Sequence, residues 1–541
     1  MSGFSIRDGQ YNIGHICTRQ QCEEGRAERV AMRFISPGTL EARDFSFNDL
    51  EVDSNRFANV LAGLGFQKGD IFFTFLPKLP EQFISFLGGL KLQAIVSTLF
   101  SNFGDEALVD RLQGAKGIIT RKSLLKRVLK AREKLPALQT ILVSDLAEDQ
   151  DGHILSYARL MEKSDARFTT SITSAETPAV LHYTSGSTAK PKGVLHVHGG
   201  IVAHSQSARE ILQLNEGEIF WCTADQGWVT GTTYGISGPW SLGVTQMHYG
   251  GGYDPRAWFQ LLEREKVSIW YTAPTALRML MREDESMLRQ YKLDALKTIF
   301  SVGEPLNPEV LHWGRRVLGR DIHDTWFQTE TGSIMIANRP GMPIKPGSMG
   351  KALNGIQALI VSDEGKVQAA NTPGNLCLKP GWPSMFVTYL NNDEVYRERF
   401  RHGYYFTGDM AQQDEDGYFW FLGRSDDVIN TAGHLVSPFE VESSLLELNE
   451  VAESGVIGAP DDILFEKVVA YVVLRPPHEW SDELDLKMRL HISNRISSMA
   501  APQEIRAVES LPKNKSGKIM RRVLKAWYLG QDSGDLSTLE I

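Results

Sequence analysis

Residues 183–193 read Tyr-Thr-Ser-Gly-Ser-Thr-Ala-Lys-Pro-Lys-Gly, and this stretch decides the fold class that we expect. It follows an apolar run at residues 179–181 that is expected to form a strand. Its glycines allow a backbone to approach a ligand closely, and its turned amides, hydroxyls and lysines are groups that bind phosphate oxygens. It is not a Walker A loop, because neither Lys190 nor Lys192 has glycine before it and Ser or Thr after it. Alone, such a stretch would more often be a surface turn with solvated lysines.

The length and composition favour a globular protein of two or more domains. A chain of 541 residues is too long for one core, and its 42% hydrophobic and 23% charged residues are ordinary. The net charge of −9 argues against a nucleic-acid-binding protein that works by neutralising phosphates. Four cysteines are too few for a disulfide framework. With no apolar signal at its start and no apolar run long enough to span a membrane, the protein is expected to be cytoplasmic.

From about residue 30 onward, apolar runs alternate with helical patterns. Strands are expected at residues 71–76, 117–120, 140–143 and 267–272, and a helix at 81–92. This alternation is typical of βαβ units and predicts an α/β fold with largely parallel sheets. A basic stretch at residues 121–132 is expected to be a helix with a solvated face.

The pattern of long apolar runs and helical segments ends near Gly403. Short, turn-rich pieces follow, including a hairpin-like turn at residues 414–418. After them comes a compact region with an expected strand at 469–474 and an expected helix at 485–496. We therefore predict two domains, a large one over residues 1–425 and a small α+β one over residues 426–541.

Six further blocks accompany the first stretch along the chain. They lie at residues 220–231, 301–306, 324–332, 405–409, 423–427 and 511–518. Each block alone has an ordinary explanation as a turn, a strand end or a charged face. In this order and spacing, over roughly residues 30–527, the seven blocks resemble the AMP-forming adenylating enzymes, and among these most of all the acetyl-CoA synthetases and their short-chain relatives.

The resemblance implies a fold and a reaction. The fold would be a large N-terminal adenylate-forming domain and a small mobile C-terminal domain. The reaction would join a carboxylic acid to AMP with release of pyrophosphate, and then pass the acyl group to coenzyme A, reversibly. Because two anions meet in the first step, positioning and charge neutralisation would carry catalysis. ATP, Mg²⁺ and coenzyme A are therefore the expected cofactors and co-substrates.

The resemblance also assigns a nucleotide site. The residues expected to hold the triphosphate are Thr184, Ser185, Gly186, Ser187, Thr188, Lys190 and Lys192. The residues expected along the adenine and the rest of the nucleotide are Gly303, Glu304, Pro305, Asp324, Thr325, Trp326, Phe327 and Gln328. Thr329 is expected beside the phosphates and Glu330 at the metal, whereas Asp409 and Arg424 are expected at the ribose hydroxyls.

Lys518 matches the catalytic lysine of the family's small domain. Its ammonium is expected to lie between the carboxylate and the α-phosphate. Read alone, it would be a solvated lysine of a basic tail, since Lys513 and Lys515 are close by. The resemblance further implies that a lysine acetyltransferase and deacetylase act on Lys518, because acetylation removes its charge.

The second half-reaction is expected to use a rotated small domain. The resemblance places the hinge at Asp426 and brings residues 431–434 to the thiol channel, where Gly433 lets the backbone line a narrow passage. Two positions depart from the family pattern: Ala189 replaces a usual glycine, and Leu435 replaces an arginine that helps to bind phosphate.

The acid specificity is expected to depend on an aromatic plug. The resemblance assigns the acyl pocket to Trp228, Val229, Thr230, Val302 and Phe327. Phe327 stands where acetate-specific relatives usually have tryptophan and longer-chain relatives tend to have glycine. We therefore expect acetate as the main substrate with propionate tolerated, because one methylene is typically worth only about 1–3 kcal/mol. A different packing of Trp228 or Trp326 would change this order.

Two other interpretations stay open from the sequence. One is a medium-chain or aryl acid CoA ligase of the same family, which the aromatic plug disfavours. The other is a nucleotide-sensing protein that is not an enzyme, which the intact Glu330, Asp409 and Lys518 disfavour and the departures at Ala189 and Leu435 favour.

Overall fold

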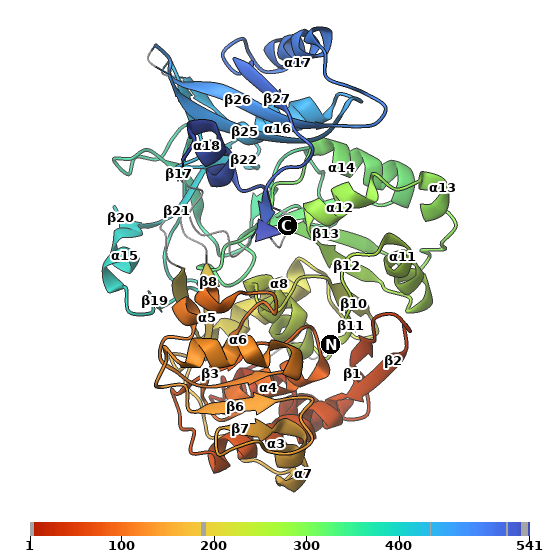
Figure 1. The fold of residues 1–541 in the computed structure, drawn as a ribbon, viewed down its shortest axis with the longest axis vertical. Helices are drawn as coiled ribbons and strands as arrows, with labels where there is room; N and C mark the ends of the chain where they lie inside the picture. Colours follow the sequence, from red (N-terminus) through yellow and green to blue (C-terminus); the bar gives the residue numbers. More distant parts are fainter. Residues whose placement is uncertain are drawn as a thin grey trace.

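The computed structural model describes residues 5–184, 191–432, 434–461, 463–514, 518–531 and 539–540. The small C-terminal part, with β25 (Val451–Asp461), β26 (Phe465–Leu474) and α17 (Asp482–Arg495), lies at one end of the molecule's long axis (Figure 1). The strands β3 (Ile71–Thr74), β6 (Thr140–Val143) and β7 (Ile154–Ser156) lie toward the other end. Among the described residues, no helix combines the length and the apolar character that a membrane crossing requires.

The first sheet has eight strands in the order β19-β9-β8-β4-β3-β5-β6-β7. Its strands are β3 (Ile71–Thr74), β4 (Ile95–Thr98), β5 (Ala115–Thr120), β6 (Thr140–Val143), β7 (Ile154–Ser156), β8 (Pro178–Thr184), β9 (Lys192–Val197) and β19 (Thr388–Tyr389). The strands β8, β4, β3, β5, β6 and β7 pair in parallel with their neighbours. Strand β9 pairs antiparallel with β8, and β19 pairs antiparallel with β9. Phe72 packs on the side of α3 (Phe47–Gly63) and α4 (Pro80–Lys91). Phe73 packs on the side of α5 (Asp105–Arg111) and α6 (Lys122–Arg132), so β3 is buried on both faces.

The second sheet has nine strands in the order β16-β15-β14-β13-β12-β10-β11-β1-β2. Its strands are β1 (Val30–Ile35), β2 (Ala42–Ser46), β10 (Ile219–Cys222), β11 (Thr245–Tyr249), β12 (Ile269–Thr272), β13 (Thr298–Val302), β14 (Ile322–Trp326), β15 (Ile336–Ala337) and β16 (Lys351–Ala352). The six strands from β1 to β14 in this order are parallel. Since the carboxyl ends of parallel strands share one edge, the blocks that follow β13 and β14 emerge side by side.

A third, antiparallel sheet connects the large part of the chain to the small part. Its strands are β17 (Ala358–Val361), β18 (Gly374–Leu378), β20 (Phe400–Arg401), β21 (Tyr404–Gln413) and β22 (Phe419–Arg424). Strands β21 and β22 form a hairpin, so the turn expected at residues 414–418 is confirmed. Asp409 lies on β21 directly opposite Arg424 at the end of β22.

The small C-terminal part has its own sheet and core. Its strands are β23 (Ile429–Thr431), β24 (His434–Val436), β25 (Val451–Asp461), β26 (Phe465–Leu474) and β27 (Glu504–Ala507), with helices α16 (Pro438–Leu446), α17 (Asp482–Arg495) and α18 (Arg521–Leu529). A short pair, β28 (Lys513–Asn514) and β29 (Leu539–Glu540), completes it. Val456, Val468 and Met488 belong to a separate buried cluster. The predicted boundary at residues 425/426 falls between β22 and β23 and stays a prediction.

Helices and short helical turns cover the sheets of the large part. Before β8 these are α1 (Ile13–Cys17), α2 (Arg19–Gln21), η1 (Cys22–Arg26), α3 (Phe47–Gly63), α4 (Pro80–Lys91), α5 (Asp105–Arg111), α6 (Lys122–Arg132) and α7 (Tyr157–Lys163). After β9 they are η2 (His198–Gly200), α8 (Ile201–Glu210), α9 (Val229–Thr232), η3 (Thr233–Ser237), α10 (Gly238–Ser241), α11 (Pro255–Arg264), α12 (Pro274–Leu280), α13 (Glu285–Leu288), α14 (Pro308–Trp313), η4 (Gly314–Leu318) and α15 (Asp393–Glu398).

The elements expected from the sequence are present, with small differences at their ends. The strand at residues 140–143 has the expected bounds, and the helix at 81–92 begins and ends one residue earlier. The strand expected to reach residue 76 ends at Thr74, although Phe75 and Leu76 are buried. An apolar run therefore predicts burial more closely than it predicts the last residue of a strand.

Candidate active site

The blocks at residues 301–306 and 324–332 lie side by side at the carboxyl edge of the second sheet. Ser301 pairs with Asp324 and Val302 with Thr325 across β13 and β14. Gly303 follows with φ 91°, a left-handed conformation that favours glycine, and turns the chain into Glu304 and Pro305. The expected adenine strip and the Thr-Glu-Thr-Gly block therefore border one site.

Asp324 is a buried carboxyl group at this edge. Its Oδ1 accepts a hydrogen bond from Ser301 Oγ at 2.7 Å. Burial raises the pKa of Asp324 to about 7, although the hydrogen bonds from Ser301 and from neighbouring backbone amides act in the opposite direction. The side chain is therefore partly protonated near neutral pH.

Asp409 is held by three side chains from two segments of the chain. Its Oδ1 accepts from Arg424 Nη1 at 2.8 Å, and its Oδ2 accepts from Trp326 Nε1 at 3.0 Å and Gln328 Nε2 at 2.9 Å. The Asp409 carboxylate in turn raises the pKa of Arg424. The structure brings these four predicted residues together, and it shows Trp326 and Gln328 orienting the carboxylate.

Glu330 lies next to the ends of the glycine-rich stretch. Its Oε1 accepts a hydrogen bond from Tyr389 Oη at 2.8 Å, and Lys192 Nζ lies 5.6 Å from the centre of the Tyr389 ring. Thr184 pairs with Lys192 across β8 and β9, so both ends of the stretch are fixed here. Burial lowers the pKa of Lys192.

Several predicted residues lie outside the described residues. They are Ser185, Gly186, Ser187, Thr188, Lys190 and Gly433. Thr329 is described, and its carbonyl oxygen accepts a hydrogen bond from His196 Nε2 at 2.8 Å. Asp426 lies in the turn that joins Arg424 to β23, and Leu435 is exposed on β24. The roles of these residues stay predictions.

The described residues contain no group of three His, Cys, Asp or Glu side chains that would hold a metal ion by itself. Mg²⁺ that binds substrate phosphates often needs only one or two protein carboxylates as further ligands, and Glu330 is a carboxylate of this kind. Glu330 therefore fits its expected role only together with a bound triphosphate.

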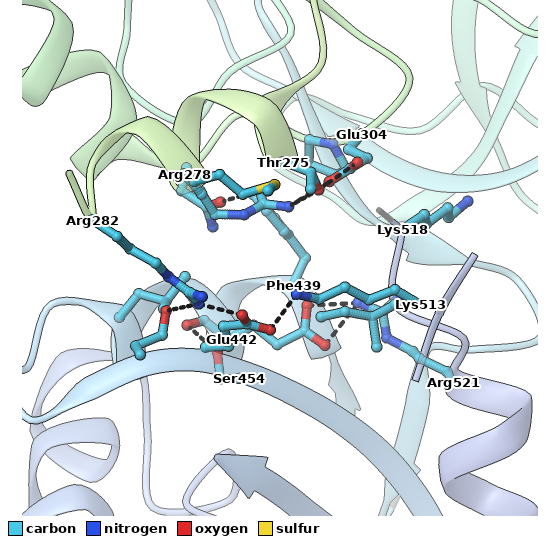
Figure 2. Close-up of a pocket in the computed structure, with 17 residues that line it drawn as sticks. Thr275, Arg278, Arg282, Glu304, Phe439, Glu442, Ser454, Lys513, Lys518 and Arg521 are labelled. Atoms are coloured by element: carbon cyan, nitrogen blue, oxygen red, sulfur yellow. Dashed lines mark hydrogen bonds and ion pairs between the residues drawn. The ribbon is translucent and has the colours of Figure 1, made fainter. Parts of the chain in front are cut away.

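Lys518 is one of the residues that line a cavity of about 80 Å³ between the large and small parts. Figure 2 shows Arg278, Arg282 and Glu304 on one side of this cavity and Glu442, Lys513 and Arg521 on the other. The side chain of Lys518 is still accessible to solvent. The surrounding protein, together with the positive charges of Arg424 and Arg521, lowers the pKa of Lys518.

Phe327 belongs to an aromatic wall on one face of the second sheet. Its ring meets Tyr234 edge-on at 5.5 Å, and Val302 and Tyr271 belong to the same cluster. Tyr234 Oη bonds to Ser207 Oγ at 2.8 Å. The structure thus brings together two of the predicted pocket residues, Phe327 and Val302.

The other predicted pocket residues lie on an adjoining segment. Val229 and Thr230 begin α9, about one helical turn before Tyr234. Trp228 packs against Phe100, with 4.9 Å between the ring centres. Val229 also borders a small internal cavity that is lined by His182, His196 and His204.

Comparisons with known proteins decide the family. Residues 18–390 match the AMP-binding enzyme family, and residues 440–518 match the AMP-binding enzyme C-terminal domain. The chain belongs to the AMP-binding enzymes. The family that the seven blocks indicated, and the α/β fold with a large adenylate-forming domain and a C-terminal domain, are therefore confirmed.

Similar AMP-binding enzymes include acetyl-coenzyme A synthetases. That of Bacillus subtilis is 44% identical over 98% of this chain and 93% of its own length. That of Rubrobacter xylanophilus is 38% identical over 98% of this chain and 87% of its own length.

Solved structures of AMP-binding enzymes have the same architecture. The anthranilate CoA ligase AuaEII in complex with anthranoyl-AMP aligns with a TM-score of 0.86 at 28% identity, over 97% of this chain and 98% of that one. An acyl-CoA synthetase of Brucella canis aligns with a TM-score of 0.74 at 32% identity, over 96% and 94% of the two chains.

Sequence reasoning missed two residues that support the site from outside the blocks, Tyr389 and Tyr234, and the close packing of Gly332 inside one of them. Tyr389 binds Glu330, Tyr234 packs on Phe327, and Gly332 lies where a Cβ atom would come within 2.4 Å of the Ser384 carbonyl oxygen. Only Gly332 carries a local signal, since it is a glycine within a predicted block. The two tyrosines are placed by long-range packing.

Proposed function

We propose that this AMP-binding enzyme is an AMP-forming acetate–CoA ligase. In the first step, an acetate oxygen attacks the α-phosphorus of ATP, and the bond to pyrophosphate breaks. In the second step, the sulfur of coenzyme A attacks the acetyl carbon, the thiol proton is lost, and AMP leaves. The observation that carries the proposal is the Asp409 carboxylate, fixed by Arg424, Trp326 and Gln328 next to the Phe327 wall.

Asp409 would accept hydrogen bonds from both ribose hydroxyls. A carboxylate is an acceptor with two oxygens, and its three protein donors fix the plane in which those oxygens lie. Glu304 and Pro305, at the end of β13, would then border the adenine. The nucleotide would extend from this edge toward Lys192 and Glu330, which lie at the ends of the glycine-rich stretch.

The phosphates would be neutralised from two sides. Lys192 and the rest of the glycine-rich stretch would bind the outer phosphates, and Glu330 would take part in holding the Mg²⁺ that accompanies ATP and spreads its negative charge. Lys518 would approach from the small domain, where its ammonium stabilises charge at the reacting oxygens. Because Lys518 is accessible to solvent, it is also the position where we propose that acetylation blocks the first step.

The acid would be selected by the aromatic wall. The Phe327 ring, in edge-on contact with Tyr234, would limit the acid to a short chain, so we propose acetate with propionate tolerated. The second step would follow rotation of residues 426–541 about Asp426, which withdraws Lys518 and brings residues 431–434 to the thiol channel.

Acid-dependent ATP–pyrophosphate exchange tests the proposal. We expect exchange with Mg²⁺ to be fastest with acetate, slower with propionate, and slow with hexanoate and benzoate. Fastest exchange with a longer or aromatic acid would keep the reaction and overturn the assignment of acetate. Absence of exchange with every acid, in a protein that binds ATP, would favour the nucleotide-sensing alternative.

A further inference from the structure

Glu453 joins the two parts of the chain at the cavity shown in Figure 2. It lies near the start of β25 in the small part. Its Oε1 accepts a hydrogen bond from Arg282, which follows α12 in the large part, and Arg282 also donates to the carbonyl oxygen of Ala452 at 3.4 Å. Its Oε2 pairs with Lys513 Nζ at 2.6 Å. One carboxylate thus holds a cation of each part.

A second polar bridge crosses the same boundary. Asn307 Nδ2 donates to Ser443 Oγ on α16 at 2.8 Å. Asn307 Oδ1 accepts from Arg278 Nη1 at 3.0 Å, and Arg278 Nη2 donates to Glu304 Oε2 at 2.5 Å. This chain of contacts runs from the predicted adenine strip to the small part.

The segment that carries Lys518 is fixed at both of its ends. Lys513, before it, binds Glu453. Arg521, after it, pairs with Glu442 at 2.6 Å and donates to the Val456 carbonyl oxygen at 3.2 Å. Contacts within the small part therefore tie both flanks of Lys518 to β25 or its neighbours, and Arg282 links β25 to the large part through Glu453 and the Ala452 carbonyl oxygen.

We propose that Glu453 is a positioning residue for adenylation. By binding Arg282 and Lys513 together, it holds the small domain in the orientation that directs Lys518 to the nucleotide site. The proposal rests on the proposed function, because it assumes that Lys518 acts in the first step only. Arg282 and Glu453 lie in different domains, so rotation about Asp426 must separate them before the second step.

The expected consequence is a change in the balance between the two orientations. Removing the contact between Arg282 and Glu453 lowers the fraction of molecules with Lys518 at the nucleotide site. The hydrogen bonds to Asp409 and the packing around Phe327 stay intact. For an ion pair that is partly exposed, we expect about a 2- to 5-fold loss of pyrophosphate exchange. Conversion of supplied acetyl-adenylate to acetyl-CoA should stay equal or rise up to about 3-fold, because the rotated orientation becomes easier to reach.

The experiment compares Glu453→Gln, Arg282→Gln and the double variant with the unchanged full-length protein. Both half-reactions are measured with acetate, and hydrogen exchange is followed in peptides from α12 and α16. Glu450→Gln is the matched control, because Glu450 pairs with Lys487 inside the small part and is 17% exposed, against 15% for Glu453. We expect faster hydrogen exchange in α12 and α16, a selective loss of the first half-reaction, and a double variant no worse than Glu453→Gln alone.

Three results would overturn the proposal. The first is an equal loss of both half-reactions in Glu453→Gln, and the second is the same loss in Glu450→Gln. The third is Arg282→Gln with unchanged pyrophosphate exchange and unchanged hydrogen exchange in α12 and α16. If none of the acids supports pyrophosphate exchange in the unchanged protein, the proposed function fails independently of the bridge. Hydrogen exchange then still decides whether Arg282 and Glu453 hold the domains together, since unchanged protection in α12 and α16 overturns the bridge.

Discussion

The wall around Phe327 and the boundary between the domains are built in opposite ways. Tyr234 and Tyr271 in the wall are fully buried, with aromatic edges in contact and hydroxyls bonded to Ser207 and Thr325. At the boundary, Arg282 is 43% exposed and its contacts are polar. A packed wall has one stable arrangement, whereas water can replace partners at a polar boundary. The region that we propose selects the acid is therefore rigid, and the contact between the two parts is exchangeable.

The largest effect is expected from the boundary side of this contrast, at Lys518. Lys518→Gln should lower acetate-dependent pyrophosphate exchange by about 100- to 1,000-fold, because it removes the charge that we propose stabilises the reacting oxygens. Conversion of supplied acetyl-adenylate to acetyl-CoA should change by less than about 3-fold, since the rotated domain no longer uses this lysine. Lys525→Gln, which removes a cation paired with Glu466 on the same part, is the control. Equal loss of both half-reactions would contradict a role confined to the first step.

A smaller effect is expected when the wall itself is opened. Phe327→Gly should raise kcat/KM for butyrate and hexanoate relative to acetate by about 10- to 100-fold, because each methylene that enters the pocket contributes about 1–3 kcal/mol. Phe327→Trp should shift the ratio in the opposite direction. If the ratio is the same in both variants, Phe327 does not limit the length of the acid.

The contribution of Asp324, at the buried edge of the second sheet, to the stability of the protein should depend on pH. Asp324 has a pKa of about 7 in the folded protein against an ordinary value of 3.8, so the folded state binds more protons between these values. Stability therefore falls as pH rises from about 4 to 7 and levels off above that range. Asp324→Asn should remove this part of the pH dependence.

Thermal unfolding at pH 5.5, 7.0 and 8.5 measures the effect. The unchanged protein should lose stability relative to Asp324→Asn as pH rises. Asp321→Asn, which changes an exposed carboxylate just before β14, should follow the unchanged protein. Parallel pH profiles for Asp324→Asn and the unchanged protein would contradict a raised pKa of Asp324.

The sequence predicted those features that have a local signal. The apolar run at residues 140–143 indicated a strand that the structure confirms, and the order of the blocks indicated a family that the comparisons confirm. The convergence of residues 301–306 and 324–332 follows from the parallel pairing of β13 and β14. Periodicity and turn chemistry act over a few residues, so a single sequence carries them.

The supporting contacts had no such signal. Tyr389 and Glu330 are 59 positions apart, and Arg282 and Glu453 are 171 positions apart. A tyrosine or an arginine in one sequence is ordinarily part of a core or a solvated face. Only the folded chain brings these partners together, which explains why the motif residues were predicted and the residues that position them were not.

The smallest expected effect is that of salt, which should weaken the domain boundary and leave the wall around Phe327 unchanged. Raising NaCl from 0.05 to 0.5 M shortens the Debye length and weakens the partly exposed pair of Arg282 and Glu453, whereas the aromatic wall has no charge to screen. The ratio of pyrophosphate exchange to thioester formation should fall by about 2-fold, with the preference for acetate over propionate unchanged. Arg282→Gln should lack this decrease, because it has already lost the pair, and this variant also corrects for the effect of salt on ATP binding. An equal decrease in Arg282→Gln would mean that salt acts elsewhere.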